Sequence, residues 1–183
     1  MTRLQSHDTT ILLRRIERQV ERARIDYMQH YTSLYIAYNT WYRRVTGAAN
    51  DRTAITALKR RFVLWQDYEE GRCMRQLGPI AARIAEVTQR EPLSTSPLVR
   101  WRGEVADAYD WRSLIEYWYQ VRCLIVHGEP LDAKHAYLAY SSLLVFLGEV
   151  QKRAAECKEG SVWSVDMYSA ASTPLLTDKN TVY

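Results

Sequence analysis

The stretch D-W-R-S-L-I-E-Y-W-Y-Q-V-R-C-L-I-V-H-G-E-P, residues 110–130, decides the fold. Asp110 can accept backbone N–H groups at a helix start, and Gly128 followed by Pro130 is a stop signal. The pattern between these signals predicts a helix from Asp110 to His127 with most of its circumference packed. Its apolar seam is formed by Leu114, Trp118, Val121 and Ile125, and is widened by Ile115, Tyr119 and Val126.

The segment that precedes this stretch has the same helical period. Apolar or aromatic residues fall three or four positions apart from Thr9 to Thr46, a range without Gly or Pro. The pattern predicts one very long helix, or two nearly collinear helices with a break near residues 27–31. Gly47 closes the segment. Its second half is dense in aromatic side chains, so we expect it to face the helix of residues 110–127.

Three further helices complete the pattern. Residues 50–51 open the first of them, because Asn and Asp side chains cap helix starts. Its apolar seam comprises Ile55, Leu58, Phe62 and Trp65. Another is predicted over residues 73–89, bent at Gly78-Pro79, and the last over residues 132–157. Residues 91–100, with two Pro and three hydroxyl side chains, form the clearest loop.

These segments predict an all-α protein, an up-down bundle of four long helices with one or two short extra helices. We expect a single helical domain over residues 1–160. The tail, residues 161–183, has no helical period and is expected to pack on its own domain or on a neighbour. The chain lacks an apolar stretch of membrane-spanning length and an N-terminal signal pattern, which favours a soluble, cytoplasmic protein without a membrane partner.

The composition permits an anionic partner and argues against a metal centre. The net charge of +4 is mildly basic. The chain has 13 Tyr and 6 Trp against 2 Phe, and such amphipathic rings suit half-buried helix faces and can stack on bases. The 3 Cys lie far apart, and the 4 His form no metal-binding spacing with them. We therefore predict reduced thiols, no metal site and no cofactor.

Arg122 and His127 are the residues best suited to chemistry. They lie off the main seam, about 140° apart around the helix axis. His127 stands in the last turn, where unpaired carbonyls favour a cationic imidazole, and a His there suits proton transfer. Arg122 supplies a permanent, fork-shaped positive charge that suits a phosphate. Such a pair favours phosphodiester chemistry, although a His before a terminal Gly can also be only a cap, and an edge Arg only solvated.

The run Y-W-Y-Q-V-R-C-L-I-V-H-G, residues 117–128, resembles the motif region of the HEPN superfamily (higher eukaryotes and prokaryotes nucleotide-binding domains). These are small all-α domains, many of them metal-independent ribonucleases, whose motif is R-x4-6-H at a helix end. Residues 35–47 and 58–65 also look like the prokaryotic R-x4-H branch, so the resemblance covers most of residues 30–150. It implies that Arg122 and His127 are the catalytic pair.

The resemblance also implies partners and further site residues. It implies a homodimer in which two motif helices meet and line one basic cleft for RNA or nucleotide. We expect Asn39, Tyr119 and Cys123 to line the substrate site. The implied setting is a toxin or phage-defence component, with an antitoxin protein as a further partner.

The chain departs from the family pattern at two positions. The residue after the motif Arg is usually polar, often Asn, whereas this chain has Cys123, which puts catalysis in doubt. A toxin subset carries R-x4-H-x-Y with a Tyr that is modified, and here Glu129 holds that place. Three hypotheses stay open: an RNA endonuclease, a non-catalytic module that binds nucleotide or RNA or dimerises, and a plain helical scaffold.

Overall fold

The computed structural model describes residues 13–17, 26–61, 68, 71–94 and 101–158, and all regular secondary structure in these ranges is helical. The main helices are α2 (Tyr27–Thr46), α3 (Asp51–Leu58), α5 (Arg72–Arg90), α6 (Trp111–His127) and α7 (Ala133–Lys158). The prediction of an all-α protein is therefore confirmed. Among these described helices none has the length and apolar character needed to cross a membrane.

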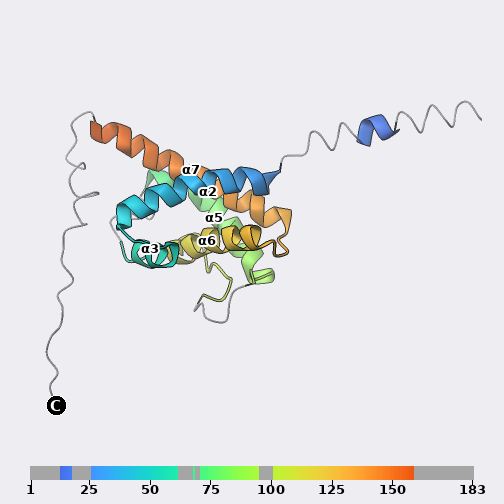
Figure 1. Ribbon diagram of the computed structural model, residues 1–183, viewed down its shortest axis with the longest axis horizontal. Helices are drawn as coiled ribbons and strands as arrows, with labels where there is room; N and C mark the ends of the chain where they lie inside the picture. Colours follow the sequence, from blue (N-terminus) through green and yellow to red (C-terminus); the bar gives the residue numbers. More distant parts are fainter. Residues whose placement is uncertain (1–12, 18–25, 62–67, 69–70, 95–100, 159–183) are drawn as a thin grey trace, which may run out of the picture.

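Two features of the packing matter for function. α7 runs alongside α2 and also contacts α5 and α6 (Figure 1). At the other side of α2, the short α3 and the long α6 come together, and each of these three helices contacts the other two. The junction of α2, α3 and α6 is therefore a place where side chains from three separate parts of the sequence meet.

The α6 helix begins and ends where the sequence predicts. The Asp110 side chain accepts the backbone N–H of Ser113 at 3.1 Å, and Gly128 ends the helix in the left-handed conformation with φ of 69°. Leu114 and Trp118 are fully buried, as the seam predicts. Val126 is 53% exposed, so the expectation that it widens the packed face is wrong.

Helix starts elsewhere also follow local capping. The Asp26 side chain accepts the backbone N–H groups of Met28 and Gln29 at 3.0 and 3.1 Å, so α2 starts at Tyr27, at the predicted break. α7 starts at Ala133, and α5 contains Pro79, both as predicted. Residues 18–25 and the tail, 159–183, lie outside the described residues, and so do residues 95–100 of the predicted loop.

The α3 helix is shorter than its apolar seam predicts. It ends at Leu58 instead of continuing through Trp65. The backbone N–H groups of Arg60 and Arg61 donate to the carbonyls of Ala57 and Leu58, a three-residue step that tightens the last turn. The Arg61 guanidinium donates to the carbonyl oxygen of Val45 near the end of α2, which draws the two helix ends together. Residues 62–67 lie outside the described residues.

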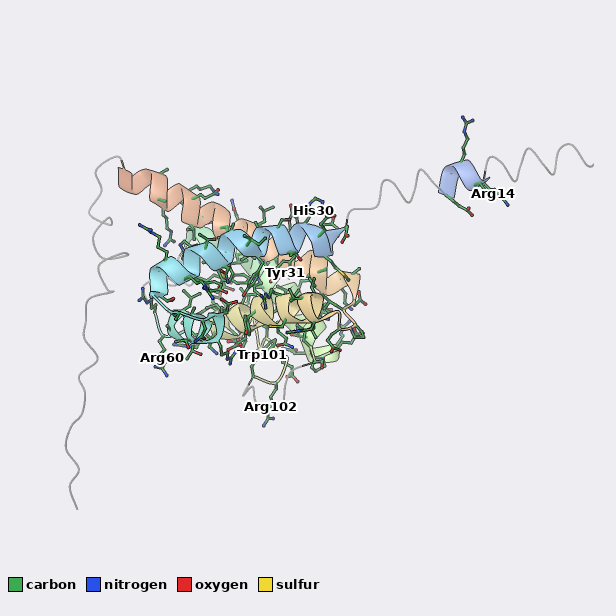
Figure 2. All side chains as sticks on the ribbon, in the orientation of Figure 1. Arg14, His30, Tyr31, Arg60, Trp101 and Arg102 are labelled. Carbon is green, nitrogen blue, oxygen red and sulfur yellow. The ribbon has the colours of Figure 1, made fainter. Side chains whose placement is uncertain are left out.

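The core between α2 and α6 is built mainly from tyrosine and tryptophan. Buried rings recur along one face of α2. They are Tyr31, Tyr35, Tyr38 and Tyr42. Tyr31 lies between α2 and α6 (Figure 2), and its hydroxyl donates to the Trp118 carbonyl oxygen at 2.5 Å. The Trp118 indole N–H donates to Ser142 of α7 at 2.8 Å. The Tyr31 hydroxyl and the Trp118 indole therefore find partners inside this core, whereas the buried Tyr38 hydroxyl and Trp41 indole N–H have no hydrogen-bond partner among the described residues.

A buried carboxylate joins α3 to α6. Glu116 is 2% exposed, and its Oε2 atom lies 2.7 Å from Nη1 of Arg52. Its other oxygen is paired with Lys59. A buried ionised carboxylate is costly unless it is paired and hydrogen-bonded, so both cations of α3 are held against α6.

Removing both cations should expose this dependence. We expect the double variant Arg52→Met with Lys59→Met to lose about 3–5 kcal/mol of unfolding free energy, because Glu116 stays buried without a partner. Adding Glu116→Gln should restore much of the loss. Urea unfolding followed by circular dichroism measures both effects.

The control is the exposed ion pair of Arg83 and Glu86 within α5. Arg83→Met should cost less than about 1 kcal/mol. If the Arg52/Lys59 double variant costs no more than this control, Glu116 does not depend on its partners.

A second buried polar pair joins α6 to the start of α7. The Tyr117 hydroxyl donates to the His135 carbonyl oxygen at 3.1 Å and lies 3.2 Å from the His135 Nδ1 atom. Burial lowers the pKa of His135, and the charge of Lys134 acts in the same direction against the smaller opposing effects of Asp132 and Glu91. The fold therefore holds His135 preferentially in its neutral form.

This pair predicts a loss of stability in mild acid. As the pH falls below about 6.5, the ordinary pKa of histidine, the unfolded chain binds a proton at this residue before the folded chain does. The unfolding free energy should then decrease until the pH passes the lower folded pKa. His135→Gln cannot titrate, so its unfolding free energy should change less between pH 7 and pH 5, about the range over which histidine titrates. Identical pH profiles of the two proteins would contradict this assignment.

Candidate functional site at the junction of α2, α3 and α6

α6 presents its motif residues on the side that its neighbours cover least. Tyr119, Arg122 and Cys123 are half-buried, whereas His127, the last residue of the helix, is exposed. These positions follow from the helical period: the main seam faces the core, and the motif residues lie off it. The predicted site residues of α6 thus lie at the border between the core and the solvent.

The surroundings of Arg122 favour its charged form. Partial burial lowers the pKa of Arg122, but the hydrogen bonding and charge of Cys123 raise it, with further contributions from Tyr35 and Asp51, so that the pKa rises overall. Tyr35 belongs to α2 and Asp51 to α3. The guanidinium therefore carries a permanent positive charge at a half-buried position of α6.

Asn39 joins the same junction from α2. Its Nδ2 group donates to Oδ1 of Asp51 at 2.9 Å and to the Tyr42 hydroxyl at 2.6 Å. The same Asp51 oxygen accepts from Nε of Arg43 at 3.0 Å. Partial burial raises the pKa of Asp51, but the hydrogen bonds from Asn39 and Arg43 more than offset this and lower it. Asp51 is thus an ionised carboxylate that ties α3 to α2 at two points.

Tyr119 completes the junction from the α6 side. Burial, followed by the charge and hydrogen bonding of Cys123, raises the pKa of Tyr119 to about 12, so its hydroxyl stays protonated at neutral pH. The Arg52 guanidinium lies over the Tyr119 ring, 5.7 Å from its centroid, within the range of a cation–π interaction. The ring is therefore held between α3 and the motif residues of its own helix.

His127 lies apart from this network. Within the described ranges its side chain makes no hydrogen bond or ion pair, in contrast to Asn39. It follows Arg122 by five positions on the helix, which corresponds to a rise of about 7.5 Å and a rotation of about 140°. Cys123 lies one turn before His127, about 40° away around the axis, so it stands between the members of the pair.

The structure therefore brings four of the five predicted site residues to one place and leaves the fifth at the helix end. It also adds residues that sequence reasoning did not single out, chiefly Asp51, Arg43 and Arg52. Asp51 was recognised only as part of a helix start, because a capping signal explains an Asp at that position completely. Its contacts to α2 depend on tertiary packing, which no local pattern contains.

The junction combines arginine side chains with the carboxylates of Asp51 and Glu116. Its guanidinium groups have more N–H donors than these contacts use and can donate to phosphate oxygens, whereas both N–H groups of the Asn39 amide are taken up by Asp51 and Tyr42. Over the described parts of the chain, there is no group of three or more His, Cys, Asp or Glu that could hold a metal ion.

Comparison with family models, with curated proteins and with solved structures finds no match for this chain. Function therefore has to be inferred from the residues of the site.

The link between Asn39 and Asp51 can be measured by a double-mutant cycle. Asn39→Ala should cost about 1–2 kcal/mol of unfolding free energy, because it removes two hydrogen bonds at a half-buried position. Asp51→Ala in that background should cost less than it does alone, giving a coupling energy above about 0.5 kcal/mol.

Thr40→Ala is the control, since Thr40 is exposed and its hydroxyl donates only to the Ile36 carbonyl of its own helix. It should show no coupling with Asp51→Ala. Strict additivity of Asn39→Ala and Asp51→Ala would refute the link.

Proposed function

We propose that the chain is a HEPN-like, metal-independent RNA endonuclease that acts as a homodimer. The observation that carries the proposal is the setting of Arg122: a half-buried, permanent positive charge on the helix that ends in His127, with the ion-paired Asp51 among the groups that raise its pKa. A site of this kind suits a phosphate on which negative charge develops. The resemblance of residues 117–128 to the HEPN motif supplies the reaction class.

In this proposal the RNA supplies its own nucleophile. The 2′-hydroxyl oxygen attacks the adjacent phosphorus, a P–O bond forms there, and the bond to the 5′-oxygen of the next nucleotide breaks. His127 accepts the proton of the 2′-hydroxyl or delivers a proton to the leaving 5′-oxygen, and solvent water carries out the other of these two proton transfers. Arg122 stabilises the charge that gathers on the non-bridging oxygens. Asn39, Tyr119 and Cys123 line the substrate site around Arg122.

The exposed end of α6 supports a dimer. Val126 is 53% exposed, next to the exposed His127, so this end of the helix offers an uncovered apolar side chain beside a polar one. In the proposed homodimer the end of the partner's α6 covers it, and each His127 then faces an Arg122 across the interface. The same proposal includes the up-down order of the four long helices and a cytoplasmic location. It also includes a toxin or phage-defence role with an antitoxin.

One observation favours a second candidate function. Cys123 stands where the HEPN pattern usually has a polar residue, and it lies in the direction from Arg122 to His127. A thiol is a weak hydrogen-bond donor and a poor substitute for an amide. The alternative is a non-catalytic HEPN-like module that binds RNA or nucleotide at the same junction or only dimerises.

Cleavage of a mixed RNA pool in EDTA separates these functions. We expect wild type to cleave, and Arg122→Ala and His127→Ala each to lose at least about 100-fold in rate, since general acid–base and charge stabilisation each contribute about that much. His30→Ala is the matched control: His30 is an exposed histidine near the start of α2, toward the other end of that helix from α3 (Figure 2).

Circular dichroism must first show that all four proteins fold. Cleavage that survives His127→Ala in a clean preparation would refute the endonuclease. RNA binding that depends on Arg122, without turnover, would establish the non-catalytic module. Neither binding nor cleavage by wild type would leave a helical scaffold.

A further inference from the structure

Three arginines from three helices point to one junction. Arg43 of α2 contacts Asp51 at 3.0 Å, and Arg52 of α3 lies over the ring of Tyr119 at 5.7 Å. Arg122 of α6 follows Tyr119 by three residues, so it is the neighbour of that ring on the same face of the helix. Because the three side chains come from rigid helices, their relative positions are set by the fold and not by a loop.

Their charge is only partly neutralised. The cations of the junction are Arg43, Arg52, Lys59 and Arg122, and its carboxylates are Asp51 and Glu116. Four positive charges against two negative charges leave a local net charge of +2, half of the +4 of the whole chain. Glu116 is only 2% exposed, so a ligand at the surface cannot contact it, although its charge still offsets that of Arg52 and Lys59.

Arg43 and Arg52 remain accessible although both are in ion pairs. Their side chains are 45% and 42% exposed. Asp51 accepts from Nε of Arg43, and Glu116 accepts from Nη1 of Arg52. A guanidinium has five N–H donors, so one contact fixes its direction and leaves others for a second acceptor. The carboxylates thus hold these arginines in position with their remaining donors at the surface.

We propose, resting on the function proposed above, that Arg43 and Arg52 bind the phosphates on either side of the one held by Arg122. The ligand of the junction is then a single RNA strand of several nucleotides, and not a mononucleotide. Guanidinium groups bind phosphate oxygens in pairs, and contacts to successive phosphates fix the register of a strand without reading its bases. Arg122 holds the phosphate that reacts, and Arg43 and Arg52 set the path of the strand.

The salt dependence of binding tests this directly. The probe is a single-stranded oligonucleotide with 2′-O-methyl riboses, which lacks the attacking hydroxyl and so cannot be cleaved. Its dissociation constant is measured for each protein between about 50 and 200 mM salt. Each phosphate contact to a single strand contributes about 0.7 to the slope of log K against log salt. We therefore expect Arg43→Gln and Arg52→Gln each to reduce the slope by about 0.7, and the double variant by about 1.4.

Two sets of variants control for charge and folding. Arg83→Gln removes an exposed, ion-paired arginine of α5 and should leave the slope unchanged. Arg43→Lys and Arg52→Lys keep the charge and the ion pairs, so they should retain the slope but bind more weakly, because an ammonium group cannot bind phosphate in the paired mode. If a glutamine variant fails to fold, the weaker binding of the lysine variant at the same position tests the inference instead.

The possible results separate a failure of this inference from a failure of the function proposed above. Wild type that does not bind the oligonucleotide at all would overturn the proposed function. Binding that needs Arg122, with slopes unaltered in both glutamine variants, would overturn only the roles of Arg43 and Arg52. Equal affinity for adenosine monophosphate, or for polyglutamate, would also overturn the inference, because it requires a strand of phosphates.

Discussion

The candidate site depends on the buried carboxylate of Glu116. An eight-residue helix such as α3 is too short to be stable in water alone, so its place must come from tertiary contacts. Its apolar residues Ile55 and Leu58 are fully buried, but apolar contacts alone tolerate small rotations. The pairing of Glu116 with Arg52 and Lys59 fixes the rotation of α3 about its own axis, because a buried charge cannot exchange its partners for water.

That rotation decides which α3 residues face the motif helix. With Arg52 turned toward α6, Asp51 one residue earlier faces α2, where Asn39 and Arg43 bind it. Asp51 and Arg52 therefore make their contacts on faces of α3 about 100° apart, one toward each long neighbour. A site assembled in this way is preorganised, since its polar groups are oriented by contacts that exist without any ligand. These buried polar contacts stabilise the fold little by themselves. Their effect is to fix the positions of the charged side chains at the junction.

The parts of this arrangement that were predictable are those encoded locally. The limits of α6 follow from Asp110 and Gly128, as the structure has them. The end of α3 was mispredicted, because an apolar seam continues in the sequence after Leu58 although the helix does not. The role of Asp51 was missed because its partners lie on another helix. Periodicity assigns a residue to a face, but it does not reveal which neighbouring element that face meets.

The separation of Arg122 from His127 constrains any mechanism that uses both. On one helix the two side chains leave about 140° apart, and Arg122 is half-buried whereas His127 is exposed. A general acid or base must lie within hydrogen-bond reach of the proton that it transfers. The exposed imidazole of His127 must therefore be oriented by a molecule that it contacts. Substrate alone could orient it, but the exposed Val126 beside it is a poor contact for a polyanion. An apolar side chain next to an exposed imidazole suits a second α6 better than it suits RNA, and for this reason a dimer is part of the proposed function.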